Sequence, residues 1–336
     1  MKGKISSYDV AKKAGVSQST VSRSLNNYPH VKAATREKVL KAIEELSFTR
    51  DEVARSLASK KTRTIGLIVG DITNPFFAES AKVVVGKAQE MEYDVILCNT
   101  NHNEANLEKY IQTLIGKRVD GIIIASADKD NEKIKDLYDQ GFPVVLYNSF
   151  IEHEKANYIA VNNYKGARLA VEHLYQLDHR RIGYIAGPSK YVTTHLRNLG
   201  YQDALKDFGI EWNEKYVYHQ EFSYDEVYQF TKQLLKEQKR PTSFFAASDQ
   251  MALAVIDAVA SENLNIPADV SVIGFDDIDL AKNQFIGLTT ITQPKDKMAT
   301  LALEKLVSLI EQHEDTDTSI QIILEPDLIQ RKTTGI

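Results

Sequence analysis

Short apolar stretches rich in β-branched residues recur through most of this 336-residue chain and constrain its fold more than any other feature. Beyond residue 63 they read, in order, IGLIV, DVILC, GIIIA, PVVLYN, YIAV, RIGYIAG, SFFAAS and VSVIGFDD. Apolar runs of this kind, alternating with helical segments, are typical of parallel strands that helices cover on both faces. We therefore predict an α/β fold with doubly wound parallel sheets for this part of the chain.

The strands divide into two groups, so we expect residues 64–330 to form one domain of two lobes. The first lobe would comprise residues 64–161 plus 294–320, and the second residues 164–290 plus 322–330. Sheets of this type bind their ligands at the carboxyl ends of the strands. The predicted ligand site is therefore a cleft between the lobes.

Residues 1–63 differ from the remainder in charge. They hold 14 Lys/Arg and 6 Asp/Glu, a net charge of +8, whereas the rest of the chain holds 27 and 40, a net charge of −13. A basic segment on an acidic body indicates a nucleic-acid contact that is confined to the basic segment. A solvated surface helix is the alternative explanation for the charge alone.

Three short helices are predicted in this basic segment, at residues 8–14, 18–25 and 34–46. Ser7 and Ser17 are suited to cap the first two, and Gly15 to end the first. So short a turn is typical of a helix-turn-helix, whose second helix can enter the major groove. We expect an all-α DNA-binding domain in residues 1–47, although such turns also occur in bundles that bind no DNA.

Motifs of catalytic sites are absent from the sequence. It has no G-x-G-x-x-G after a strand, no phosphate-binding G-x-x-x-x-G-K-[ST], no H-E-x-x-H and no G-x-S-x-G. Asp276 and Asp277 are adjacent carboxylates, but neighbours at a strand end point to opposite sides, so at most one faces a cleft. We expect no enzyme activity, no cofactor and no metal site.

The cellular compartment is predicted from what the sequence does not contain. The chain begins MKGKISSYDV, has no apolar run near the roughly 18 residues of a membrane helix, and has one cysteine, Cys98. A single cysteine forms no internal disulfide and suits a reducing compartment. We expect a soluble cytoplasmic protein with no membrane partner.

Taken in order, several motifs resemble the LacI/GalR (lactose-repressor) family of transcriptional regulators over essentially the whole chain. YDVAKKAGVSQSTVSRSLN followed by TREKVLKAIEEL is similar to the family's DNA-binding domain, and VARSLASKKT to its hinge. NPFF, GYIAGP, SDQMAL and VSVIGFDD are similar to the effector-binding core that the family shares with periplasmic sugar-binding proteins.

The resemblance implies a homodimeric repressor of carbohydrate-utilisation genes. It would bind a pseudo-palindromic operator and respond to a small sugar or sugar derivative held between the lobes. The alternatives are control by a protein corepressor, as in the catabolite-control branch of the family, and control by a non-sugar effector such as a purine.

The resemblance also implies roles for residues of the DNA-binding domain. Gln18, Ser19 and Arg23 would read bases, since Gln can bond adenine and Arg guanine bidentately. Backbone contacts are implied for Tyr8, Ser17, Thr20, Ser22, Asn26 and Thr35. In the hinge, residues 48–63, contacts in the minor groove are implied for Ala54, Arg55, Leu57 and Lys60, with Leu57 as the wedge. The chain departs from the family at Lys32, where a serine commonly caps the third helix.

The implied effector-binding residues come from both lobes: Asn74, Phe76, Phe77, Asn148, Arg197, Phe222, Ser248, Asp276 and Gln293. Aromatic faces pack on the apolar face of a sugar ring, while charged groups bond its hydroxyls. Asn148 replaces a common Asp of the family, and Ser248 a common Asn. Core packing is the alternative role for Phe76 and Phe77, and a structural ion pair is the alternative for Arg197 and Asp276.

Overall fold

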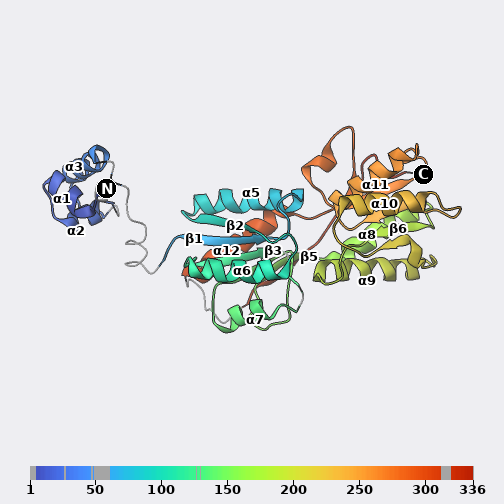
Figure 1. The fold of residues 1–336 in the computed structure, drawn as a ribbon, viewed down its shortest axis with the longest axis horizontal. Helices are drawn as coiled ribbons and strands as arrows, with labels where there is room; N and C mark the ends of the chain where they lie inside the picture. The colour runs from blue at the N-terminus through green and yellow to red at the C-terminus, as the bar shows by residue number, and fades with distance from the viewer. Residues whose placement is uncertain are drawn as a thin grey trace. The chain divides into compact units, whose positions relative to one another are not determined.

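The structure, a computed structural model, describes residues 5–25, 28–46, 48, 61–125, 127–128, 130–311 and 319–335. The chain divides into two compact units, Met1–Thr62 and Arg63–Ile336, whose elements are labelled in Figure 1. The first unit is all-helical in its described residues, and the second contains both β-sheets.

The first unit is a small bundle of α1 Ser7–Ala14, α2 Gln18–Leu25 and α3 Ala33–Glu45. Its core contains Val10, Val21 and Val39, which are completely buried. Gly15 ends α1 in the left-handed conformation, at φ 69°, which glycine adopts without steric cost. Only three residues separate α1 from α2, which confirms the predicted helix-turn-helix.

The cap of α1 differs from the prediction. Ser6 rather than Ser7 is the N-cap: its Oγ accepts from the N–H of Asp9, and the Asp9 carboxylate accepts from the N–H of Ser6 at 2.8 Å. This reciprocal arrangement needs an acidic or amide side chain three residues after the cap, where Ser7 has only Val10. The N-cap of α3 is Lys32, whose side chain makes no capping hydrogen bond.

The second unit contains two six-stranded sheets. The first has the order β11-β5-β4-β3-β1-β2, with β1 Thr64–Val69, β2 Asp94–Asn99, β3 Gly121–Ala125, β4 Val144–Tyr147, β5 Tyr158–Val161 and β11 Gln321–Leu324. The second has the order β12-β10-β9-β8-β6-β7, with β6 Ile182–Ile185, β7 Val217–Tyr218, β8 Ser243–Ala246, β9 Ser271–Asp276, β10 Thr289–Thr292 and β12 Leu328–Ile329. The predicted pair of doubly wound α/β lobes is confirmed.

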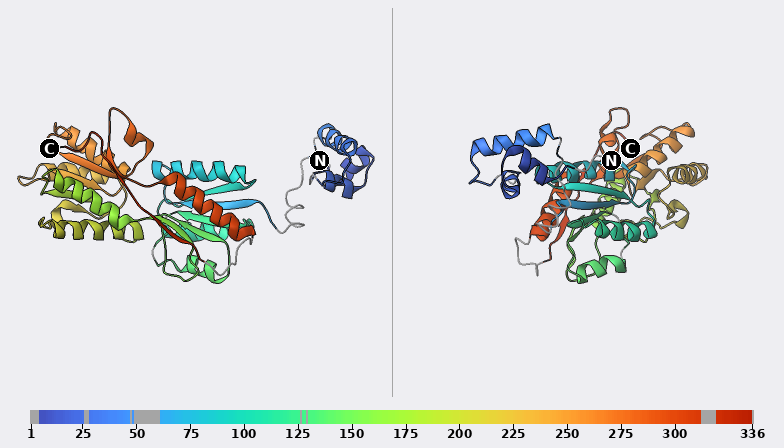
Figure 2. Two further views of the ribbon diagram at one scale, coloured as in Figure 1. Left: turned by 180° about the vertical axis from the view of Figure 1, so that it is seen from behind. Right: turned by 60° about the vertical axis from the view of Figure 1, so that its left-hand side comes forward.

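Helices cover both faces of the first sheet. They are α5 Pro75–Glu90, α6 Glu104–Gly116, α7 Glu132–Asp139 and α12 Lys295–Glu311. Alternate residues of a strand point to opposite faces, so Leu67 and Ile123 pack with α5 and α12, while Ile68 and Ile122 pack with α6 and α7. Figure 2 shows α12, coloured red, lying along the first lobe.

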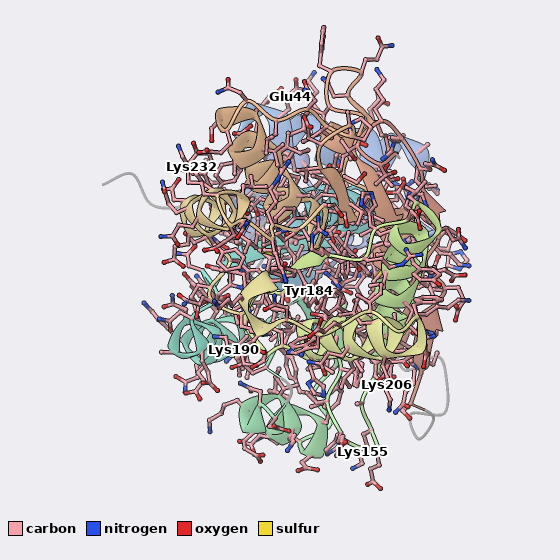
Figure 3. The ribbon with its side chains drawn as sticks, turned by 90° about the vertical axis from the view of Figure 1, so that its right-hand side faces the viewer. Glu44, Lys155, Tyr184, Lys190, Lys206 and Lys232 are labelled. Atoms are coloured by element: carbon pink, nitrogen blue, oxygen red, sulfur yellow. The ribbon has the colours of Figure 1, made fainter. Side chains whose placement is uncertain are left out.

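The second lobe is layered in the same way by α8 Asn163–Gln176, α9 Val192–Asp207, α10 Tyr224–Leu235 and α11 Asp249–Ser261, with short 3₁₀ turns η1 Glu214–Tyr216 and η2 Asp279–Lys282. Helix α8 packs with α9, and α10 with α11. Tyr184 of β6 lies inside this lobe and is fully buried, whereas Lys206 and Lys232 lie toward its periphery (Figure 3).

The chain crosses between the lobes after β5, after β10 and after β11. The third crossing comes later than predicted: residues 322–324 belong to the first lobe, because β11 pairs with β5. Strand β12 then enters the second sheet from the side where the carboxyl ends of the other strands lie, so it runs antiparallel to β10. The second sheet is therefore mixed rather than wholly parallel.

Among the described residues, none of the helices combines the length and the apolar character that a membrane span requires.

Candidate functional site

The solvent-facing side of α2 carries the residues predicted to read bases. The helix turns Val21 into the core, while Gln18, Ser19 and Arg23 are exposed. Gln18 Nε2 donates to Ser7 Oγ at 2.7 Å, which ties the beginning of α2 to α1. Three exposed polar side chains on one face of the second helix fit the geometry by which such helices contact base edges.

The residues predicted to contact the DNA backbone are placed around the same helix. Tyr8, Ser17 and Ser22 are exposed, whereas Thr20 and Thr35 are partly buried. Ser17 Oγ accepts from the N–H of Thr20 at 3.1 Å and so caps α2, as predicted. The remaining predicted DNA contacts lie outside the described residues: Asn26, Ala54, Arg55, Leu57 and Lys60.

A cleft between the two lobes of the second unit is lined by all nine residues predicted to bind the effector. Asn74, Phe76, Phe77 and Asn148 come from the first lobe, Arg197, Phe222, Ser248 and Asp276 from the second, and Gln293 from a crossing segment. The cleft contains about 760 Å³ of space free of protein atoms, its open mouth included. Both lobes therefore contribute walls to one cleft, as the carboxyl ends of two facing parallel sheets allow.

The first-lobe wall is formed by the N-terminus of α5 and by the end of β4. Asn74 caps α5, since its Oδ1 accepts from the N–H of Phe76 at 3.0 Å. The rings of Phe76 and Phe77 meet edge to face at 5.3 Å, and they line the cleft while also belonging to the core. Asn148 follows β4 at φ 49°, and its Oδ1 is buried without a hydrogen-bond partner among the described residues.

Arg197 of α9 is the buried cation of the second-lobe wall, with 6% of its surface exposed. Its Nε donates to Asn163 Oδ1 at 2.7 Å, and its Nη1 donates to the carbonyl oxygen of Ala247. The guanidinium lies 3.7 Å from the ring centre of Phe275. Burial lowers the pKa of Arg197, but a guanidinium stays charged in proteins. Hydrogen bonds to Asn163 and Ala247, rather than an ion pair with Asp276, hold it in place.

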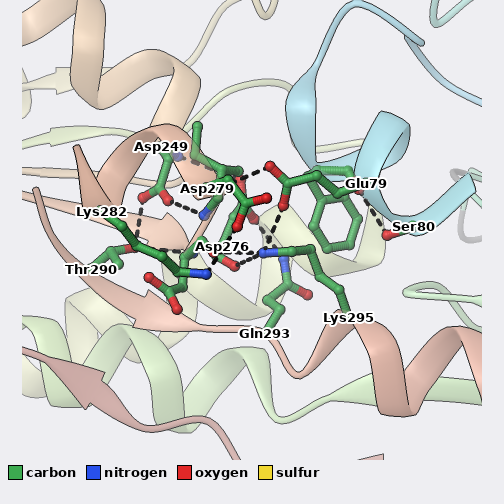
Figure 4. Close-up of polar contacts among 12 residues, drawn as sticks. Glu79, Ser80, Asp249, Asp276, Asp279, Lys282, Thr290, Gln293 and Lys295 are labelled. Atoms are coloured by element: carbon green, nitrogen blue, oxygen red, sulfur yellow. Dashed lines mark hydrogen bonds and ion pairs between the residues drawn. The ribbon is translucent and has the colours of Figure 1, made fainter. Parts of the chain in front are cut away.

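Asp276 at the end of β9 is the buried anion of the cleft (Figure 4). Its Oδ1 accepts from Gln293 Nε2 at 2.6 Å, and its Oδ2 accepts from the N–H of Asp249 at 3.4 Å. Burial raises the pKa of Asp276, and the positive charge of Arg197 opposes this. Burial, and then the charge of Asp276, raise the pKa of Asp249, whose carboxylate accepts from Thr290 Oγ1 at 2.6 Å.

Asp277 points away from the cleft, as the alternation of a strand predicts. Its Oδ1 lies 2.5 Å from Arg331 Nη2, near the C-terminus of the chain. Ser248, by contrast, lines the cleft while also capping α11, because its Oγ accepts from the N–H of Met251 at 3.2 Å. Only one carboxylate of the adjacent pair is therefore available to a ligand.

The large side chains of the cleft that sequence reasoning missed include His102 and Tyr191. The His102 ring lies 5.1 Å from Phe222 and 5.6 Å from Tyr191, and its Nδ1 is 3.2 Å from the Tyr191 hydroxyl. Burial lowers the pKa of His102, which favours a neutral ring. A signal was available, because these residues follow β2 and β6 at the carboxyl edges of the sheets, where ligands bind.

Comparisons with known proteins cover both units. Residues 7–51 match the family described as "Bacterial regulatory proteins, lacI family", and residues 171–334 match the "Periplasmic binding protein-like domain". Catabolite control protein A of Priestia megaterium is 35% identical over 314 residues, 93% of this chain and 94% of that protein. The ribose operon repressor of Escherichia coli K12 is 35% identical over 96% of this chain and 98% of its own length. The PurR repressor of Photobacterium profundum is 34% identical over 97% of both chains.

Solved structures agree with these relatives. The Lac repressor dimer bound to operator and the anti-inducer ONPF has a TM-score of 0.86 and 29% identity, with 99% of both chains covered. The complex of the regulator CelR with cellobiose has a TM-score of 0.73 and 29% identity, with 98% of this chain and 99% of that chain covered. This protein is thus a DNA-binding transcriptional repressor rather than an enzyme. It belongs to the lacI family of bacterial regulatory proteins.

Proposed function

We propose that this repressor is controlled by a neutral carbohydrate, or a close sugar derivative, bound in the cleft between the lobes. The observation that carries the proposal is a set of buried acceptors that lack donors. Asn148 Oδ1 and Gln293 Oε1 are both buried without a hydrogen-bond partner among the described residues, and both residues line the cleft. Unpaired buried acceptors are costly, and sugar hydroxyls would supply the missing donors.

The other walls of the cleft suit the rest of a sugar ring. The rings of Phe76, Phe77 and Phe222 offer apolar surface to its C–H face. The cationic Arg197 and the anionic Asp276 balance each other, so the cleft favours no net charge on the ligand. The sugar-binding relatives, the ribose operon repressor and the CelR–cellobiose complex, support the same class of ligand.

A purine is the second candidate effector. The PurR relative is almost as similar to this chain as the ribose operon repressor. The clustered rings of Phe77, His102, Tyr191 and Phe222 would also suit a planar base. The unpaired acceptors favour the sugar, because a sugar offers more hydroxyl donors than a purine offers N–H groups.

On the DNA side, we propose that two copies bind the half-sites of a pseudo-palindromic operator in the cytoplasm. Gln18, Ser19 and Arg23 would read bases, and Tyr8, Ser17, Thr20, Ser22, Asn26 and Thr35 would contact the backbone. Ala54, Arg55, Leu57 and Lys60 would occupy the minor groove. The dimeric Lac repressor supports the homodimer.

Calorimetric titration of the full-length protein tests the effector class. D-ribose, cellobiose, a sugar acid, a sugar phosphate and hypoxanthine would be titrated separately, and operator affinity measured with each by fluorescence anisotropy. We expect a neutral sugar to bind and to change operator affinity. Binding of hypoxanthine alone would replace the sugar with a purine. A response to none of them would favour the protein-corepressor alternative, which the catabolite control protein relative supports.

A further inference from the structure

Lys295, the first residue of α12, binds the backbone that carries the cleft's carboxylate (Figure 4). Its Nζ donates to the carbonyl oxygens of Asp276 at 2.9 Å and Asp277 at 2.6 Å. The same Nζ lies 3.2 Å from Glu79 Oε2. An ammonium group has three donors, and these three acceptors match them. Lys295 therefore holds the carboxyl end of β9 without itself lining the cleft.

Glu79 brings the first lobe into this cluster. It belongs to α5, one turn beyond the cleft residues Phe76 and Phe77. Its Oε1 accepts from the N–H of Asp279 at 2.9 Å, in the second-lobe segment that follows β9. One carboxylate thus contacts both the second lobe and Lys295, which begins a helix packed on the first lobe. Glu79, Lys295 and the backbone of residues 276–279 thus form a cluster that joins the two lobes next to the ligand cleft.

The backbone that these two residues hold is in an unfavourable conformation. Asp276 has φ 133° and Asp277 has φ 53°, values that L residues rarely adopt. Such a conformation is unfavourable for an L residue and persists only where the surroundings impose it. Here it turns the Asp276 carboxylate into the cleft and the Asp277 carboxylate toward Arg331. The carbonyl oxygens of both residues are held by Lys295.

The ion pair between Glu79 and Lys295 is shielded from water. The Lys295 side chain is 10% exposed and that of Glu79 23%. Pairs on the open surface contribute little to stability, whereas removing one partner of a shielded pair leaves an uncompensated charge. Helix α5, which carries Glu79, also has an exposed ion pair for comparison. Lys87 and Glu90 pair at 2.8 Å, and their side chains are 42% and 66% exposed.

We infer that Lys295 and Glu79 are positioning residues that hold Asp276 in its ligand-binding orientation, and that they do so by joining the two lobes. The inference rests on the proposed function, because it assigns a role in binding the effector of that cleft. Neither residue needs to touch the ligand. Glu79 and Lys295 both lie on helices of the first lobe. Closure of the lobes brings them to the second-lobe backbone of residues 276–279, which completes the geometry of Asp276, so ligand affinity and lobe closure are linked through this cluster.

The first test needs no ligand. Hydrogen exchange would be followed by mass spectrometry in the peptide containing Asp279, for the wild type, Glu79→Ala, Lys295→Met and the control Glu90→Ala. We expect faster exchange in the first two variants only, because only they remove contacts to the segment after β9. Wild-type exchange rates in both variants would overturn the inference, whatever the effector proves to be.

The second test is a double-mutant cycle on the dissociation constant, by calorimetry with D-ribose or cellobiose, whichever the wild type binds. We expect Lys295→Met to raise Kd about tenfold and Glu79→Ala several-fold, with Glu90→Ala unchanged. The fold-increase in Kd of the double variant should be smaller than the product of the two single fold-increases, since both residues act on one segment. Strictly multiplicative effects would overturn the linkage. If Lys295→Met does not fold, Glu79→Ala and Lys295→Arg complete the comparison.

The two tests separate the inference from the proposed function. A wild type that binds no carbohydrate contradicts the proposed function, while hydrogen exchange still decides whether the cluster joins the lobes. If the wild type and all variants bind a carbohydrate equally well, the inference is contradicted and the proposed function stands.

Discussion

Replacing Arg197 with methionine tests whether the buried cation binds the effector or only supports the fold. Two of the five N–H donors of a guanidinium are used by Asn163 and Ala247. The other three are available to a ligand in the cleft, which Arg197 lines. Methionine is similar in length and can keep the packing against Phe275, so the substitution removes mainly the charge and the donors.

The magnitude follows from the hydrogen bonds that are lost. A hydrogen bond to a charged group contributes about 1.5–3 kcal/mol, so two bonds to sugar hydroxyls correspond to about 3 kcal/mol at the lower limit, or roughly 150-fold in Kd. Folding stability should fall as well. Asn163 is fully buried, and loss of the donor to its Oδ1 should cost about 1–3 kcal/mol. Arg197→Met should therefore raise Kd and lower folding stability.

The assay compares two measurements on the same preparations. Calorimetry with the sugar that the wild type binds gives Kd, and urea unfolding gives stability. Arg168→Met is the matched control, since Arg168 lies in the same lobe, pairs with Asp207 at 2.8 Å and does not line the cleft. We expect its Kd to be that of the wild type. If Arg197→Met lost stability but kept the wild-type Kd, its role would be structural and the ligand would bind elsewhere in the cleft.

Three further substitutions test other parts of the molecule. Arg23→Ala should relax the base preference at one operator position by about 1–3 kcal/mol, measured by binding to a set of operators substituted at single positions; equal loss on every sequence would make Arg23 a backbone contact. Gly200→Ala should destabilise the protein by roughly 2–3 kcal/mol in urea unfolding, because the added Cβ would stand 2.3 Å from the carbonyl oxygen of Tyr164 and force α8 from α9; an unchanged midpoint would refute this contact. Burial lowers the pKa of His173, so the unfolded chain takes up its proton first and stability falls as pH drops below about 6.5. His173→Gln should flatten that decline in the free energy of unfolding by at most about 1.4 kcal/mol per pH unit. The same slope in variant and wild type would show that His173 is not its cause.

The layered fold could be predicted because its signals are local. A buried parallel strand such as β3, GIIIA, is apolar at every position, and most such runs here are followed by a helix. Five of the nine cleft residues lie in the motifs NPFF, SDQMAL and VSVIGFDD of the family resemblance, and the other four were assigned from the same resemblance. All nine line one cleft although residues 74 and 293 are far apart in sequence. The turn at Gly15 was predictable for a similar reason, since a glycine three residues before a helix has few other roles.

The predictions that failed depended on pairing between distant segments or on competition between neighbours. Nothing local distinguishes β11 as a first-lobe strand, because its membership is decided by β5, more than 150 residues earlier. Ser6 and Ser7 are equally good caps by type, and only the position of Asp9 selects Ser6. His102 and Tyr191 belong to no motif, and their contact depends on how the two lobes meet.

The end of β9 links the cleft to two other parts of the second unit. Asp276 faces the cleft, Asp277 pairs with Arg331 near the C-terminus, and the backbone of both is held by Lys295. A ligand that donates a hydrogen bond to Asp276 therefore adds its contact at the point where the lobes already meet. This hydrogen bond must favour the arrangement of the lobes in which Lys295 holds the end of β9, because only that arrangement presents the Asp276 carboxylate to the ligand. Coupling between a ligand and a second site typically amounts to about 1–3 kcal/mol, which is no more than one or two hydrogen bonds at this junction supply.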